Sequence, residues 1–321
     1  MTNGYLSHPM QEYHVRKVTI EEGRARGLHL IEVSTSAGLD VDLFPDHGLD
    51  IGQVRYRGTN MTFISKNGYS APSAAQAFGS EFLRYFPGGL LYTCGLRSTG
   101  PEHEDNGEWH PLHGRYHLQP AEMISTRENE ESFVIEGTVR EASLFGPVLS
   151  LHRVIEIPKN GSSICAYDSI RNETPMEQEY ALLYHCNFGW PLVSDQAHLE
   201  LDPERKTTPR TPFAATGLGR ELTFDAPVPG EEERVFFHEN MQAEAAIANP
   251  SLGVRMKMTW SDTLPILAHW RSMASGDYVC GLEPTNCYIM GRKQERENGT
   301  LPVLAPGAFI NTSLTFSFES I

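Results

Sequence analysis

Apolar and polar side chains alternate at every position of residues 254–260, Val-Arg-Met-Lys-Met-Thr-Trp. A period of two is typical of a β-strand that buries one face and leaves the other in water. The same pattern recurs along residues 27–33, 39–43, 132–137, 148–157, 164–170 and 309–318. Turn sequences stand between such runs, for example at residues 67–68, 159–161 and 229–230. No stretch carries a long apolar stripe at helical spacing, so the sequence predicts an all-β fold, a large antiparallel β-sandwich.

The chain has 321 residues, which is long for one domain, although all-β units of ~250 residues and more are common. No linker-like stretch rich in Gly, Ser or Pro divides it. We therefore expect an N-terminal extension over residues 1–24 and a single domain over residues 25–321. The most polar segment, residues 201–234, is predicted to be a long surface excursion. Such a segment can border a binding site or be a plain connection, and both fit its composition.

The overall charge disfavours two classes of partner. The chain carries 41 acidic and 26 basic side chains, a formal net charge of −15. This excess of negative charge repels phosphate backbones and anionic lipid, so we expect neither a nucleic acid nor a membrane as partner. The first residues do not resemble a secretory signal, and the five cysteines are scattered with no CxxC pair. We expect reduced thiols and a cytoplasmic protein, either monomer or homodimer.

Motif searches remove several kinds of chemistry. The sequence holds no GxSxG elbow, no GxxxxGK[ST] loop and no GxGxxG after a strand, which disfavours serine acyl transfer, nucleotide hydrolysis and dinucleotide redox reactions. Four segments differ from ordinary strand sequence. They are residues 82–95 (FLRYFPGGLLYTCG), 110–117 (HPLHGRYH), 183–192 (LYHCNFGWPL) and 281–286 (GLEPTN). The paired glycines of the first segment are expected to let the backbone approach another part of the molecule closely.

These four segments, in this order, resemble the aldose 1-epimerase, or galactose mutarotase-like, superfamily, and more narrowly its less-studied branch. The resemblance runs from about residue 48 to the end of the chain. It implies that His185 is the general acid, that Glu283 is the general base and that His113 binds the sugar. It also implies that Arg84 binds substrate. Asn187 is a further candidate for substrate binding, although it follows the second histidine more closely than in well-known galactose mutarotases.

The chemistry of anomer exchange explains why these residue types are suitable. A base removes the proton of the C1 hydroxyl while an acid protonates the ring oxygen. The ring then opens, and closure on the other face of C1 gives the second anomer. General acid–base help of this kind contributes ~10²–10⁴-fold. No cofactor and no metal is expected, and the expected ligand is a small sugar or sugar derivative. The aspartate that contacts sugar hydroxyls in the well-known enzymes has no match here, so the sugar stays open.

Two alternatives remain open from the sequence. His110, His113 and His117 are numerous enough to hold a divalent ion in a metal-dependent sugar isomerase, although only positions 113 and 117 share a face of a strand. The second alternative is a sugar-binding or sensing module that keeps the cleft but not the turnover. Two tryptophans, Trp190 and Trp270, are expected to lie in the core rather than to form a platform for the sugar.

Overall fold

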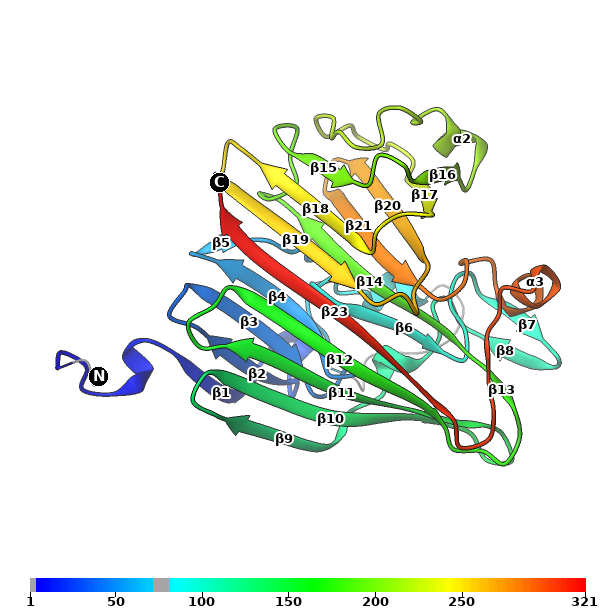
Figure 1. The fold of residues 1–321 in the computed structure, drawn as a ribbon, viewed down its shortest axis with the longest axis horizontal. Helices are drawn as coiled ribbons and strands as arrows, with labels where there is room; N and C mark the ends of the chain where they lie inside the picture. The colour runs from blue at the N-terminus through cyan, green and yellow to red at the C-terminus, as the bar shows by residue number, and fades with distance from the viewer. Residues whose placement is uncertain (1–3, 72–80) are drawn as a thin grey trace.

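The computed structural model describes residues 4–71 and 81–321, and antiparallel β-sheets form most of it (Figure 1). Within the described residues, three sheets of eight, six and five strands form the body of the molecule. In the part of the chain that the structure describes, helix is limited to short segments, α1 (Phe82–Tyr85), α2 (Pro212–Ala215) and α3 (Arg292–Asn298), and to the 3-10 turns η1 (Pro9–Gln11), η2 (Gly23–Ala25) and η5 (Tyr116–Leu118). The predicted all-β sandwich is confirmed.

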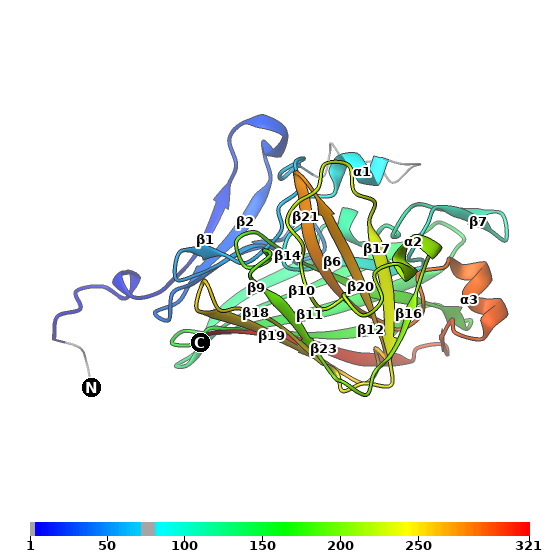
Figure 2. The same cartoon turned by 90° about the horizontal axis from the view of Figure 1, so that it is seen from above.

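The eight-stranded sheet contains most of the stretches that the alternating sequence pattern predicts. In spatial order its strands are β15 (His198–Leu201), β18 (Glu244–Asn249), β19 (Val254–Trp260), β23 (Phe309–Ser320), β12 (Ser163–Asn172), β11 (Val148–Pro158), β10 (Ser132–Ala142) and β9 (Glu122–Glu128). Along β19 every second residue is buried, as alternation requires. This sheet forms one layer of the sandwich, and Figure 2 shows it edge-on below the other strands.

The six-stranded sheet forms the second layer. Its strands, in order, are β16 (Lys206–Pro209), β17 (Arg234–Glu239), β20 (Ile266–Ala274), β21 (Asp277–Thr285), β14 (Ala181–Gly189) and β6 (Tyr92–Leu96). Every residue of β14 and β6 is buried, because both faces of these strands are covered. Tyr184 and Cys186 on one face belong to the main core that all three sheets share. Leu183, on the other face, belongs to a smaller apolar cluster that also contains Phe86.

The five-stranded sheet comes from the first part of the chain. Its strands are β1 (His14–Thr19), β2 (His29–Ser34), β3 (Leu39–Phe44), β4 (Asp50–Tyr56) and β5 (Thr59–Asn60). β1 lies within the predicted extension of residues 1–24, yet it pairs with β2 along its whole length. Two short antiparallel pairs are also present. β7 (His103–Asp105) forms a hairpin with β8 (Glu108–His110), and β13 (Gln178–Glu179) pairs with the distant β22 (Val303–Leu304).

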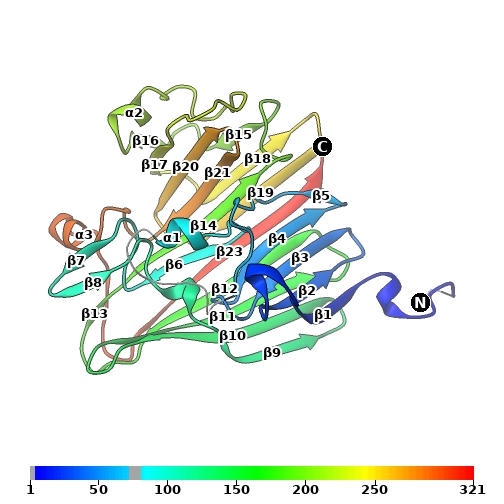
Figure 3. The same cartoon turned by 180° about the vertical axis from the view of Figure 1, so that it is seen from behind.

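The outer face of the six-stranded sheet carries two covering segments. Seen from behind, α1 lies over the region of β14 and β6 (Figure 3), and its Phe82 and Phe86 pack into the smaller cluster. The excursion of residues 201–234 runs along the β17 edge and contains β16 and α2. The face between these two segments remains open to a ligand.

Candidate active site

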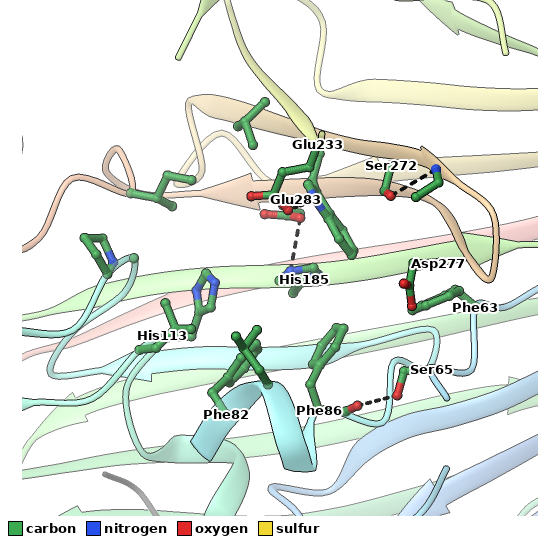
Figure 4. A pocket seen from close by; sticks show the side chains of 18 of the residues that line it. Phe63, Ser65, Phe82, Phe86, His113, His185, Glu233, Ser272, Asp277 and Glu283 are labelled. Atoms are coloured by element: carbon green, nitrogen blue, oxygen red, sulfur yellow. Dashed lines mark hydrogen bonds and ion pairs between the residues drawn. The ribbon is translucent and has the colours of Figure 1, made fainter. Parts of the chain in front are cut away.

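A pocket of about 630 Å³ lies on the outer face of the six-stranded sheet, which is the size of ordinary small-molecule sites. Side chains of β14, β20 and β21 form its floor, and the α1 segment and the excursion form its walls. Figure 4 shows His113, His185 and Glu283 directed into one space, with Phe82 and Phe86 facing them. Three of the residues predicted from the sequence therefore line a single cavity.

The pairing of β14 with β21 brings His185 and Glu283 together. Cys186 pairs with Leu282 in an antiparallel register, so the residues directly opposite each other at the next position are His185 and Glu283. Directly opposed residues share one face of the sheet. Their side chains accordingly project side by side into the pocket, with His185 Nε2 and Glu283 Oε1 3.3 Å apart (Figure 4). The two atoms are close, but their geometry is not that of a hydrogen bond, and Glu283 Oε1 has no hydrogen-bond partner.

Small neighbours make room for the Glu283 carboxylate. Ala268 on β20 is directly opposite Glu283 on its other side. Gly281 precedes it by two positions and therefore occupies the same face of β21. A Cβ atom at position 281 would lie 2.6 Å from Glu283 Oε1, which is closer than van der Waals contact allows. The absence of a side chain at this glycine is thus a condition for the position of the carboxylate.

Burial brings the proton affinities of the two groups toward each other. It raises the pKa of the Glu283 carboxyl well above its usual value, the nearby Glu233 carboxylate raises it further, and Arg210 opposes them. Burial also lowers the pKa of His185 well below its usual value, and the neighbouring His113 lowers it further. Both shifts have the same origin, because a low-dielectric surrounding penalises the charged form of either group. Both shifts reduce the preference of the pair for its charged form over its neutral form.

His113 reaches the pocket from the loop after β8. Its backbone has a positive φ of 62° and is followed by Gly114 at φ 81°. A Cβ at position 114 would lie 2.4 Å from the Ser98 carbonyl oxygen, so the residue after the histidine must be glycine. The His113 and His185 rings meet edge to face, with their centroids 5.5 Å apart. His113 Nδ1 is buried without a hydrogen-bond partner, and burial, with the nearby Arg210, lowers its pKa to about 4.

Aromatic rings surround the pair. Phe86 lies 5.1 Å and Trp270 5.3 Å from the His185 ring, measured between centroids. Trp270 is half-buried against the smaller apolar cluster and lines the pocket, while Trp190 is 73% exposed. The prediction that both tryptophans lie in the core is wrong. For Trp270 the reason is its position on the ligand-facing side of β20, where the indole Nε1 donates to Glu233 Oε2 at 2.7 Å.

The structure does not bring Arg84 to the pocket. Phe82 and Phe86 are four residues apart and face the pocket together, and a residue two positions along a helical turn points away from them. The Arg84 side chain is accordingly 75% exposed, with its Nε 3.4 Å from Glu81 Oε1. The paired glycines that follow α1 allow the close backbone approach predicted from the sequence. A Cβ at Gly88 would lie 2.3 Å from the Phe63 carbonyl oxygen.

Asn187 lies behind the pocket rather than on its surface. Its side chain is fully buried and is not part of the pocket lining. The amide Nδ2 donates to the carbonyl oxygens of Gly89 at 3.0 Å and His185 at 2.9 Å. These bonds tie β14 to the paired glycines, so Asn187 holds the strand that carries His185.

The three histidines of the metal alternative lie in different surroundings. His110 stacks on His103 with ring centroids 5.2 Å apart. His113 faces the pocket, and His117 Nδ1 bonds to Asp50 Oδ2 at 2.7 Å. Across residues 4–71 and 81–321, no group of three His, Cys, Asp or Glu side chains is arranged to hold a metal ion. The turn at residues 111–115 lies between these histidines and places the three rings in separate surroundings.

Sequence reasoning missed three residues of the excursion that line the pocket, Arg210, Glu231 and Glu233. It also missed a buried charge network under the floor, in which Arg153 bonds to Asp50 at 2.5 Å and to Asp168 at 2.7 Å. A signal for the network was present, because Arg153 occupies a core-facing position in the alternating pattern of β11. For the excursion, its length and polarity indicated only a surface location.

These features define the fold, which is a β-sandwich like those of solved galactose mutarotase-like proteins. The fold matches that of a protein from Klebsiella pneumoniae subsp. pneumoniae described as a candidate aldose 1-epimerase, with a TM-score of 0.88, 22% identity, and coverage of 95% of this chain and 83% of that one. Galactose 1-epimerase from Lactobacillus acidophilus matches with a TM-score of 0.67 and 15% identity, over 96% and 99% of the two chains. A galactose mutarotase-like protein from Clostridium acetobutylicum matches with a TM-score of 0.67 and 12% identity, over 97% and 100%.

The family is given by the sequence itself. The chain belongs to the family described as a domain of unknown function, DUF4432, whose profile matches residues 25–318. None of the curated proteins has a matching sequence. In the part of the chain that the structure describes, no helix has the length and apolar character needed to span a membrane.

Proposed function

We propose that this protein is a mutarotase, an isomerase that interconverts the α and β anomers of a sugar. The observation that carries the proposal is the buried pair of His185 and Glu283, 3.3 Å apart on the floor of the pocket. The hydroxyl oxygen and the ring oxygen that must exchange protons are both attached to C1 of the sugar. An acid and a base fixed side by side on one face can therefore address both oxygens at once.

The proton balance of the reaction fits the two shifted pKa values. In the reactive state Glu283 is a carboxylate and His185 is an imidazolium. Glu283 takes the proton of the C1 hydroxyl while His185 gives its proton to the ring oxygen, and the C1–O bond of the ring breaks. The pair is then a carboxylic acid and a neutral imidazole, and closure reverses both transfers. Burial raises the pKa of Glu283 and lowers that of His185, which shifts the balance from the ion pair toward the neutral pair.

The other lining residues would bind and orient the sugar. The face of Trp270 offers an apolar surface for the ring, and such contacts are typical of aromatic residues with a polar edge. His113 Nδ1 and His185 Nδ1 are buried without hydrogen-bond partners, and buried polar atoms of this kind are normally satisfied. Sugar hydroxyls would supply the missing partners, at least for the nitrogen atoms that face the cavity.

The test is NMR exchange between the α and β resonances of a panel of sugars. The wild-type protein should accelerate exchange of at least one sugar well beyond the rate in buffer. Binding of a sugar without accelerated exchange would contradict the proposal and support a non-catalytic sugar-binding module. The five cysteines are free thiols, and this supports the further proposal of a cytoplasmic location, where thiols stay reduced.

A further inference from the structure

We infer that Arg210 selects sugars that carry a single negative charge, such as the carboxylate of a hexuronic acid, at the end of the molecule away from C1. The inference rests on the proposed function, because it assigns the substrate class of the same pocket. It begins with the position of Arg210 directly after β16.

The sheet register directs Arg210 toward the pocket. Pro209 pairs with Phe236, and the Arg210 backbone N donates to the Val235 carbonyl oxygen at 2.9 Å, so Arg210 continues the pairing opposite Val235. Val235 pairs in turn with Trp270, and opposed residues share a face. Arg210, Val235 and Trp270 thus form one row across the floor, and all three line the pocket.

Within residues 4–71 and 81–321, the Arg210 guanidinium has no ion-pair partner. Two other charged pairs lie at the rim, with Lys66 Nζ 2.7 Å from Asp277 Oδ2 and Arg234 Nη1 2.5 Å from Glu231 Oε1, while Glu233 accepts from the neutral indole of Trp270. No ion pair or hydrogen bond of the described chain engages the Arg210 side chain. Arg210 is exposed at the pocket wall, so its guanidinium can pair with an anionic group of a bound sugar.

The geometry and the charge balance define the anion further. Arg210 and Glu283 are three strands apart across the sheet, which is roughly 14 Å between backbones at about 4.8 Å per strand. An anion beside Arg210 therefore belongs to the far end of a sugar whose C1 lies at Glu283. A guanidinium binds a carboxylate through two parallel hydrogen bonds. A single guanidinium matches one negative charge, whereas a phosphate dianion would leave a charge facing Glu233 and Glu283.

The experiment measures binding by calorimetry and anomer exchange by NMR, with D-glucuronate, D-galacturonate, the parent hexoses and glucose 6-phosphate. Wild-type protein should bind one of the uronates about 10- to 100-fold more tightly than its parent hexose, which is the usual gain from a charge-assisted hydrogen bond. Arg210→Gln should remove this preference, and Arg210→Lys should keep part of it. Arg220→Gln is the matched control, because Arg220 belongs to the same excursion and pairs with Asp225.

The outcomes separate the inference from the proposed function. Accelerated exchange of a neutral hexose with no uronate preference would overturn the role of Arg210 and leave the mutarotase intact. Uronate binding that depends on Arg210 without accelerated exchange would support the inference and contradict the mutarotase. Tightest binding of glucose 6-phosphate, no binding of either uronate, or an unchanged preference in Arg210→Gln would each overturn the inference.

Discussion

Replacing Glu283 by Gln should stabilise the protein, and the gain should grow with pH. The carboxyl is fully buried, and burial raises its pKa well above the usual value of 4.5, so the native state binds more protons than the unfolded state. Stability then falls as the pH rises from about 4.5 to the folded pKa, by about 1.4 kcal/mol per pH unit. The advantage of the variant should therefore grow by about 1.4 kcal/mol, or roughly 3 °C in Tm, for each pH unit within that range.

Urea and thermal unfolding of both proteins at several pH values between 4.5 and 8 would measure this difference. The pH at which the difference stops growing gives the folded pKa of Glu283. Glu204→Gln is a suitable control, because Glu204 is an exposed carboxylate of the excursion and its replacement should change stability little at any pH. A stability difference that does not depend on pH, or a destabilised Glu283→Gln, would refute the assignment of a buried, destabilising carboxyl.

Three further predictions follow from the surroundings of the pair. Gly281→Ala places a Cβ 2.6 Å from the present position of Glu283 Oε1, so NMR should show anomer exchange falling by tenfold or more while circular dichroism stays unchanged. Glu233→Gln keeps an acceptor for the indole of Trp270 but removes a negative charge that raises the pKa of Glu283; the limb of the pH–rate profile that reports Glu283 should therefore move to lower pH, and an unmoved profile would exclude this coupling. Arg153→Met leaves two buried carboxylates without their cation and should cost about 3–5 kcal/mol in urea unfolding, whereas a cost below 1 kcal/mol would show that the network relaxes.

Much of the fold could be predicted because one face of most strands is wet. Alternation identified β19 over residues 254–260 and the long strands β11 and β12. It carries no information about β14, whose two faces are both buried, and there only the resemblance singled out His185. Periodicity also failed at β1, where the exposed and half-exposed residues of an edge strand show no clear alternation.

The candidate site was predictable only in part, because different structural features bring its residues to the pocket. His185 and Glu283 lie on paired strands, so a register places them together, and their identity follows from the sequence resemblance. The direction of Arg84 depends on a single helical turn whose two phenylalanines pack inward, and that turn has no sequence pattern of its own. Arg210 comes to the pocket through a strand pairing of the excursion, which no local pattern indicates.

The rate of anomer exchange in Glu283→Gln, His185→Asn and the double variant tests the central claim most directly. Exchange of the sugar that the wild-type protein accelerates most should fall by ~10²-fold or more in each single variant. The double variant should lose much less than the product of the two effects, because proton removal and donation belong to one event. Full exchange in a folded Glu283→Gln protein, or single losses that multiply in the double variant, would contradict the coupled action of this pair.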